Sequence, residues 1–323
     1  MEKRNWGVIG TGAIAHEMAA ALRRVNGEIY AVCGTSPEKA RRFAEECGVK
    51  KAHGSAEELI ADPEVGIVYI AVPHSCHYEY LLKALQAGKH VLCEKAVTVN
   101  SRQLEECVAV AEKSGLVICD GTTLLHMPLY KKLRRLVDDG AIGAVRMIQV
   151  NFGSCKEYDE TNRFFAKDLA GGALLDIGVY AASFARFFME SSPDLVLTTA
   201  EFAATGVDET SGILLKNSAG QMAVIALTLR AKQPKRGVIA GEKGFIEICE
   251  YPRAQRATIT YTESGRTEVI EEGESSRALD YEVLDMQEYV RTGGGGENLR
   301  MVRDVMEILT AVRSRWGMVY PFE

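Results

Sequence analysis

The sequence predicts an α/β protein of two domains: a doubly wound parallel sheet over residues 1–120, and an α+β domain on a mostly antiparallel sheet over residues 121–323. Three observations support this prediction. In the first part, short apolar segments alternate with helical patterns, as in a parallel sheet with helical crossovers. After residue 143, apolar segments follow one another with few helices between them, which favours antiparallel pairing. A length of 323 residues is typical of two domains.

Five strands are expected in the first domain, and the helices between them have recognisable ends. Ser55 and Glu58 form a capping-box pattern, and Asn100 with Gln103 offers a similar helix start. Gly88 and Gly115 stand where helices end in a left-handed turn. The predicted strands are Trp6–Ile9, Ile29–Cys33, Ile67–Val72, His90–Cys93 and Leu116–Cys119.

The second domain is expected to contain seven strands before helical patterns return. Asn217–Gly220 has the composition of a hairpin turn. Helices are predicted over Leu279–Arg291 and Asn298–Arg315, joined by a flexible glycine run at 293–296. The predicted strands are Val145–Phe152, Leu195–Ala204, Ile213–Lys216, Met222–Leu229, Gly237–Ala240, Phe245–Ile248 and Thr258–Tyr261.

Composition narrows the functional class. A net charge of −6 and the lack of a basic block argue against a nucleic-acid partner. No signal peptide is expected, and no apolar run approaches the ~18 residues that span a membrane. Eight scattered cysteines without a CxxC pair indicate a reduced, cytoplasmic protein and no metal site.

A phosphate-binding loop is predicted immediately after the first strand. The segment Gly10-Thr11-Gly12-Ala13-Ile14-Ala15 has the GxGxxA arrangement and opens a helix. The first glycine permits a tight turn, the second permits close approach of a pyrophosphate, and the small third residue lets helix and strand pack. A plain tight turn is the alternative, but the position in a β-α-β series favours a dinucleotide site.

The end of the second strand favours NADP over NAD. An acidic residue there would bind the ribose 2′-hydroxyl, but the chain has Gly34-Thr35-Ser36. The two hydroxyl groups and Lys39, with Arg41 and Arg42 nearby, suit a 2′-phosphate. The alternative is that these basic side chains are simply solvated and that the cofactor is NAD.

Lys95 follows the strand His90–Cys93 at the edge of the sheet where such folds bind ligands. In the second domain Asp176 and Tyr180 are four residues apart, so that a helix would place them on one face. A lysine, an aspartate and a tyrosine that converge on a nicotinamide can move a proton, because the ammonium group lowers the phenol pKa. A helix cap for Asp176 and a core position for Tyr180 are equally open.

At these residues the chain resembles the Gfo/Idh/MocA family, the oxidoreductases related to glucose–fructose oxidoreductase and inositol dehydrogenase. The markers are GTGAIA at 10–15, AVPHSCH at 71–77, HVLCEKA at 90–96 and AGGALLDIGVY at 170–180. The resemblance implies a Rossmann domain followed by a domain with a large open sheet that is often used for oligomerisation. It implies Lys95 as the catalytic lysine and Asp176 as the aspartate of the second domain.

The resemblance also suggests a branch of the family. Tyr180 and the segment around Arg163 are similar to glucose–fructose oxidoreductase, NADP-linked xylose dehydrogenase and dimeric dihydrodiol dehydrogenase. Arg163 is therefore assigned to substrate binding with Lys95, Asp176 and Tyr180. His126 is either a further residue of the substrate cleft or a packing residue.

Two departures from the family pattern concern the cofactor. Ala96 replaces a proline that is often cis, and since a cis bond before alanine is costly, Lys95 is expected to sit somewhat differently. Val72-Pro73-His74 replaces a Pro-Asn pattern that is common in the family, so that His74 is a candidate cofactor neighbour. His77 matches the family histidine of that loop, and capping or packing remains open for both histidines. The cofactor neighbours assigned from these loops are Val72, Pro73, His74, His77, Glu94 and Lys95.

The leading prediction is an NAD(P)-dependent oxidoreductase, with NADP favoured, that acts on a sugar, polyol or related hydroxyl or carbonyl compound. The alternatives are a non-catalytic dinucleotide-binding regulator and an NAD-dependent glycosidase of the same fold. The strand Met222–Leu229 has hardly a polar side chain, as expected of a strand that is covered on both faces. A homodimer or higher homo-oligomer built on residues 143–262 is therefore predicted.

Overall fold

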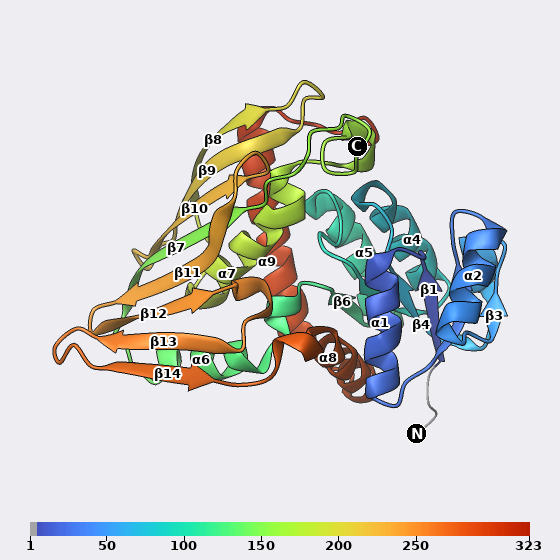
Figure 1. The fold of residues 1–323 in the computed structure, drawn as a ribbon, viewed down its shortest axis with the longest axis horizontal. Coiled ribbons are helices and arrows are strands. Elements are labelled where there is room, and N and C mark those ends of the chain that lie inside the picture. Colours follow the sequence, from blue (N-terminus) through green and yellow to red (C-terminus); the bar gives the residue numbers. More distant parts are fainter. Residues whose placement is uncertain (1–4) are drawn as a thin grey trace. The chain divides into compact units, whose positions relative to one another are not determined.

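The computed structural model describes residues 5–323, and the chain divides into two compact units (Figure 1). Unit 1 contains the described residues up to Gly121 together with Leu279–Arg300, and unit 2 contains Thr122–Ala278 and Met301–Glu323. The predicted division at residue 120 placed the segment 279–300 with the second domain, but this segment packs in unit 1.

Unit 1 is built on a six-stranded parallel sheet in the order β3-β2-β1-β4-β5-β6. The order reverses between β1 and β4, which is the topological switch point of a doubly wound fold. Its strands are β1 Asn5–Ile9, β2 Ile29–Cys33, β3 Lys51–Ala52, β4 Val65–Ile70, β5 His90–Cys93 and β6 Ile118–Asp120. Its helices are α1 Ala13–Arg24, α2 Pro37–Cys47, α3 Ala56–Ala61, α4 His74–Gln86, α5 Ser101–Ser114 and α8 Ala278–Thr292.

Local capping explains where several of these helices begin and end. The Ser55 hydroxyl accepts the Glu58 amide at 3.1 Å, and the Asn100 side chain accepts the Gln103 amide at 2.9 Å, as predicted. Glu58 reaches back to the amide of Gly54, one residue before the cap. Gly88 and Gly115 have the predicted positive φ angles, 76° and 64°.

Helix α8 belongs to unit 1 because its apolar face completes the core of that unit. Leu279, Val283 and Met286 are buried in the same cluster as residues of β1, β4 and α1. Arg24, in the last turn of α1, pairs with the fully buried carboxylate of Asp280, and the closest N–O distance is 2.6 Å. A helix distant in sequence therefore supplies part of this core, which local patterns do not reveal.

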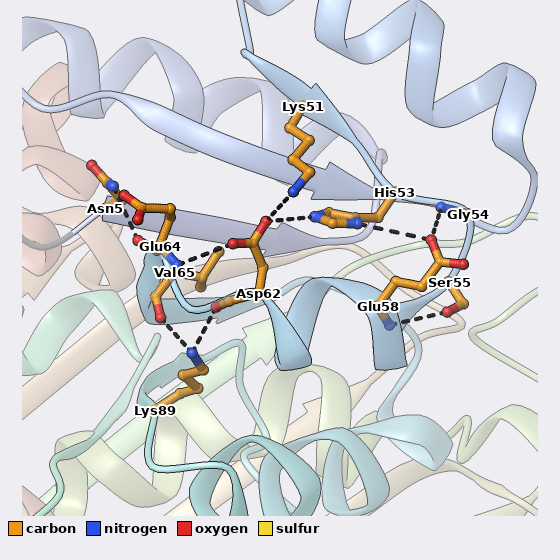
Figure 2. A network of polar contacts seen from close by, with 10 residues as sticks. All are labelled: Asn5, Lys51, His53, Gly54, Ser55, Glu58, Asp62, Glu64, Val65 and Lys89. Carbon is orange, nitrogen blue, oxygen red and sulfur yellow. Dashed lines mark hydrogen bonds and ion pairs between the residues drawn. The ribbon is translucent and has the colours of Figure 1, made fainter.

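A polar network fixes the short strand β3 and helix α3 (Figure 2). The buried carboxylate of Asp62 accepts hydrogen bonds from Lys51 at 2.7 Å and from the Glu64 amide at 3.0 Å, and His53 lies 3.1 Å away. Lys89 donates to the Asp62 carbonyl oxygen at 2.8 Å. The Lys51 bond is the main reason why the pKa of Asp62 is lowered to about 2.

Unit 2 is built on an eight-stranded sheet in the order β14-β13-β12-β11-β7-β10-β9-β8. Neighbours are antiparallel, except that β10 pairs with β7 in parallel. The predicted hairpin at Asn217–Gly220 joins β9 to β10, with Lys216 opposite Met222. The strands are β7 Val145–Gly153, β8 Leu195–Phe202, β9 Asp208–Lys216, β10 Met222–Thr228, β11 Gln233–Gly241, β12 Gly244–Cys249, β13 Arg256–Tyr261 and β14 Thr267–Glu271.

Helices of unit 2 lie against one face of this sheet (Figure 1). They are α6 Pro128–Asp138, α7 Val179–Phe188 and the part of α9 (Gly296–Trp316) that belongs to this unit. Helix α7 approaches closely because glycines leave room for it: a Cβ atom on Gly237 of β11 would lie 2.3 Å from the Phe184 ring, and one on Gly178 would lie 2.7 Å from Leu227.

The helical stretch Lys167–Phe188 corrects the expectation that no segment is long and apolar enough to span a membrane. By length and composition it could cross a membrane, although the sequence showed no uninterrupted apolar run of that length. Within unit 2, 83% of its most apolar window is buried. The stretch is apolar because it forms the core layer beneath the sheet. Core helices of globular proteins have the same length and composition.

The other face of the sheet carries apolar side chains that the chain itself leaves exposed. Leu197 is 54% exposed, Val224 41% and Val269 47%. Leu214 of β9 stands opposite both Leu197 and Val224, so that these side chains form one row across three strands. Within one chain, β10 is covered on one face only: Ala223, Ile225 and Leu227 are buried, and the opposite face is partly open, which leaves the predicted cover of that face to a second copy.

Candidate functional site

The loop Gly10–Ala15 of unit 1 has the backbone geometry that the sequence predicted for a phosphate-binding loop. The amide of Gly10 donates to the Cys33 carbonyl oxygen at 3.0 Å, which ties β1 to the end of β2. Gly10 has φ +117°, and a Cβ atom there would lie 2.2 Å from the Ala71 carbonyl oxygen. No atom lies within 4 Å of a Cβ position on Gly12, the residue that precedes α1. The helix amides therefore face open space of the kind that a pyrophosphate fills.

A cavity of about 450 Å³ opens at this loop, at the carboxyl ends of β1, β2 and β4. It gathers residues from the phosphate loop, the end of β2 and the turn before α4, as expected of a dinucleotide site at a switch point. The predicted cofactor residues that line it are Gly10, Thr11, Gly12, Gly34, Thr35, Lys39, Val72 and Pro73.

Other predicted cofactor residues lie outside the lining of this cavity. Ser36 caps α2 by accepting the Lys39 amide at 3.3 Å, so its hydroxyl already has a structural role. His77 is fully buried. Ala13, Ile14, His74, Glu94 and Lys95 also do not line it.

The cavity wall also includes Arg42, which the sequence placed among the basic residues near a 2′-phosphate, and two residues that no sequence pattern indicated. Arg42 contributes a second positive side chain next to Lys39, whose ammonium group donates to the Thr35 hydroxyl at 3.1 Å. Tyr80 of α4 and Ala56 of α3 also line the cavity. Neither of these two belongs to a local motif, because only the packing of α3 and α4 beside β2 and β4 brings them to this place.

Lys95 lies just beyond β5, where the sequence placed it. The preceding residue, Glu94, accepts a hydrogen bond from the Tyr69 hydroxyl at 2.5 Å, and burial raises the pKa of its carboxyl group. The peptide bond between Lys95 and Ala96 is cis. The expectation that alanine would disfavour this isomer is not met, and the bond has the form that the family resemblance associates with proline.

Two histidines of α4 hold the backbone around Lys95. A ring nitrogen of His74 donates to the Lys95 carbonyl oxygen at 3.0 Å. His77 has its two ring nitrogens 2.8 Å from the carbonyl oxygens of Ala96 and Val72. Burial lowers the pKa of His77, and its two carbonyl contacts oppose this shift. Both histidines are thus placed to shape the lysine segment.

In unit 2, Asp176 and Tyr180 lie on consecutive helical turns after a glycine pair. Asp176 belongs to a π-helical turn, Leu174–Gly178, and is 6% exposed; Tyr180 is half-buried in the first turn of α7. Asp176 is not the helix cap that the sequence left open. Its carboxylate lies 3.4 Å from the Arg163 guanidinium group, so two of the predicted substrate residues are neighbours.

An aromatic and cationic surface surrounds this pair. The Tyr180 ring lies 6.2 Å from that of Phe152, over which Lys235 is placed at 5.3 Å. The Arg163 guanidinium group lies 4.2 Å from the ring centre of Phe164. Phe152 is buried and Phe164 is half-buried, and aromatic rings beside a carboxylate and a phenol can hold the apolar face of a cyclic substrate.

His126 is the remaining predicted substrate residue. It directly follows the 3₁₀ turn Thr123–Leu125 in unit 2 and is fully buried there. Such burial is typical of a packing residue, which is one of the two alternatives that the sequence left open.

Comparisons with known proteins agree with this geometry. Residues 4–122 match the family described as "Oxidoreductase family, NAD-binding Rossmann fold", and residues 130–247 match the GFO/IDH/MocA C-terminal domain. A trans-1,2-dihydrobenzene-1,2-diol dehydrogenase from Xenopus laevis is 31% identical over 98% of this chain and 99% of that protein. The Xenopus tropicalis enzyme of the same name is 35% identical over 75% of this chain and 74% of its own.

Solved structures show the same fold at lower identity. A 3-ketoreductase from Actinomadura kijaniata, in complex with NADP and TDP-benzene, has a TM-score of 0.86 at 24% identity and covers 97% of this chain and 98% of its own. A levoglucosan dehydrogenase with NADH and levoglucosan has a TM-score of 0.87 at 20% identity, with 98% of each chain covered. The chain belongs to the GFO/IDH/MocA family of oxidoreductases, with the NAD-binding Rossmann fold in unit 1.

Proposed function

We propose that this protein transfers hydride between NADP(H) and a secondary hydroxyl or carbonyl group of a cyclic diol or sugar-like compound. The observation that carries the proposal is the set of proton-handling side chains: Lys95 just after β5, and Asp176 with Tyr180 at the start of α7. The relatives named as dihydrodiol dehydrogenases support a cyclic diol, and the ketoreductase and levoglucosan dehydrogenase structures support sugar-like substrates.

The cavity of unit 1 suits NADP. Gly10 and Gly12 leave space for the pyrophosphate, while Thr35, Lys39 and Arg42 at the β2 end can meet a 2′-phosphate. None of these three residues is acidic, so the usual recognition of a free ribose hydroxyl is missing. The bound cofactor would accept or donate the hydride. Unit 1 is accordingly the dinucleotide-binding domain of the proposal, and unit 2 is the domain for substrate binding and assembly.

Each of the three side chains has a separate role in the proposal. Tyr180 is the general acid or base that exchanges a proton with the substrate oxygen. Lys95 is assigned the positive charge that favours the ionised form of such a phenol during the proton exchange. Asp176 orients a substrate hydroxyl, and the Arg163 guanidinium group lies 3.4 Å from its carboxylate. Removal of a general acid or base commonly costs ~10²–10⁴ in rate.

The test is a substrate panel. Purified protein is mixed with NADP⁺ and trans-dihydrobenzenediol, levoglucosan or aldoses, and the absorbance band of reduced nicotinamide is followed; sugar ketones with NADPH test the reverse direction. Turnover of a member of the panel, abolished in Tyr180→Phe, supports the proposal. Cofactor binding without turnover of any of these would instead favour a regulator, and release of a sugar without net change in the band would favour a glycosidase.

The proposal extends to assembly and location. The exposed apolar row Leu197–Leu214–Val224 on the sheet of unit 2 suits a two-fold, sheet-against-sheet homodimer. All eight cysteines are free thiols, six of them buried or half-buried, which suits a reduced compartment such as the cytoplasm.

A further inference from the structure

A buried carboxylate lies against the glycine turn that precedes Asp176 and Tyr180. Asp208, the first residue of β9, is fully buried, and its Oδ2 atom accepts the Leu174 amide at 2.8 Å. The Ala173 amide also favours the charged form of this carboxylate. A carboxylate on the first amides of a helix satisfies donors that have no partner within the helix.

The opposite oxygen of Asp208 explains why residue 172 is glycine. Gly172 has φ +122°, and a Cβ atom there would lie 2.3 Å from Oδ1 of Asp208. Any side chain at this position would collide with the carboxylate. Within residues 5–323, Oδ1 has no hydrogen-bond partner, and it occupies the place that a side chain of residue 172 would need.

The C-terminal segment holds the same turn from another side. The Tyr320 hydroxyl donates to the Gly171 carbonyl oxygen at 2.7 Å, and the Arg313 guanidinium group lies 4.6 Å from the Tyr320 ring centre. Two nitrogens of Arg313 donate to the two carboxylate oxygens of Glu323, both at 2.7 Å. The charged and titratable groups that act on Asp208 are therefore Arg313 and Tyr320, with Glu323 paired to the former.

These surroundings place the ionisation of Asp208 near neutral pH. Burial raises its pKa to about 7, against the opposing effects of the helix amides and of Arg313. An ordinary exposed aspartate would stay charged throughout the neutral range.

We infer that Asp208 is a positioning residue: its carboxylate holds the main chain at Gly172–Leu174 and so fixes Asp176 and Tyr180 on the turns that follow. The inference rests on the proposed function, because it assigns Asp208 an effect on the reaction through these two side chains. The ionised form makes the stronger bonds to the helix amides, so turnover depends on the charge of Asp208.

The decisive variant is Asp208→Asn, which keeps the volume and one acceptor oxygen but removes the charge. We expect kcat to fall tenfold or more, while the KM for NADPH changes less than twofold. In the wild-type protein, kcat should rise with pH near 7 as Asp208 ionises. This rise should be absent from the kcat–pH profile of Asp208→Asn, a change that a purely structural role would not produce. Glu209→Gln is the matched control: Glu209 is the next residue on β9, where its carboxylate lies 3.5 Å from Arg230.

A second measurement separates this inference from the proposed function. Hydrogen exchange of the amides of residues 172–180 should become faster in Asp208→Asn and in Gly172→Ala, but not in Glu209→Gln. If the wild-type protein turned over no substrate, the proposed function would fail, and unchanged exchange in Asp208→Asn would still overturn the inference. In an active protein, a variant that retains the wild-type kcat, or that has a lower kcat but keeps its rise near pH 7, would overturn it.

Discussion

The Nδ1 atom of His77 lies 2.8 Å from the carbonyl oxygen of Ala96, the residue that follows the candidate catalytic lysine. The other ring nitrogen lies 2.8 Å from the Val72 carbonyl oxygen in the turn before α4. Carbonyl oxygens only accept hydrogen bonds, so a neutral imidazole donates to one of the two at a time. His77 thereby links the lysine segment to the turn that lines the cofactor cavity.

Replacement of His77 by leucine should impair both stability and turnover. The Ala96 and Val72 carbonyl oxygens would lose their donor in a buried place, at a cost of about 1–3 kcal/mol for an unsatisfied group. Because the segment that carries Lys95 would be held less firmly, we expect kcat to fall at least tenfold. Thermal unfolding and steady-state kinetics measure the two effects. Ser75→Ala, two residues away on α4, is the control, and a His77→Leu protein with lower Tm but wild-type kcat would contradict the assigned role.

Lys95→Ala and Tyr180→Phe should each remove most turnover without loss of NADPH binding. Neither side chain lines the phosphate-loop cavity, and a general acid or base typically contributes ~10²–10⁴ in rate. Kinetics with the best substrate of the panel and fluorescence titration of NADPH test the two parts separately. Lys113→Ala, an exposed lysine at the end of α5, controls for the loss of charge. Wild-type kcat in both variants would remove the proposed mechanism.

The sequence predicted the doubly wound sheet, the glycine turn after β1 and most strands of unit 2, because each has a local signal. Two strands without an apolar pattern were missed: β3, two residues with exposed side chains, and β14 at the sheet edge, in which only the neighbours Val269 and Ile270 are apolar. Strand β4 was predicted two residues too late, since Ala71–Pro73 form the turn before α4 rather than the end of the strand.

Features that depend on packing between distant segments escaped prediction. The parallel pairing of β7 with β10 requires a long crossover, and no pattern in either strand predicts this pairing. Asp208 stands at the start of a strand whose predicted range began only at Ile213, and only the folded chain brings it to Gly172. Tyr80 reaches the cofactor cavity for the same reason.

Cofactor preference should depend on the residues at the end of β2. Lys39→Ala removes a positive charge that can meet the 2′-phosphate, so the Kd of NADPH should rise about tenfold, in the range of a charge-assisted hydrogen bond, with that of NADH unchanged. Thr35→Asp adds a carboxylate that repels the phosphate and should shift the preference further toward NADH. Fluorescence titration of both cofactors decides this, with Lys50→Ala as the control outside the cavity. Tighter binding of NADH by the wild-type protein would mean that the basic side chains are merely solvated.

The Asp62 network predicts a definite dependence of stability on pH. The pKa of Asp62 is lowered to about 2 in the folded protein, from 3.8, chiefly by the Lys51 hydrogen bond. Its stabilising effect is therefore fully present above pH 4 and is lost as the pH falls through 2. We expect Asp62→Asn to lower Tm at neutral pH, and the difference from wild type to shrink in acid. Asp139→Asn, an exposed position after α6, should show neither effect, and a pH-independent difference for Asp62→Asn would contradict the electrostatic cause.

Assembly should depend on the exposed row of apolar side chains on the sheet of unit 2. Leu197 and Val224 are 54% and 41% exposed and flank Leu214 across neighbouring strands, an arrangement that soluble monomers rarely leave uncovered. Light scattering of the wild-type protein at micromolar concentration should give at least twice the chain mass of 35.4 kDa. Val224→Lys puts a charge into this row without touching the buried face of β10, so the mass should fall toward that of one chain while the far-UV spectrum stays unchanged. Ser114→Lys, an exposed position in unit 1, adds the same charge elsewhere and should leave the mass as in the wild type. A wild-type mass of 35.4 kDa would mean that the row is not an interface between copies of this chain.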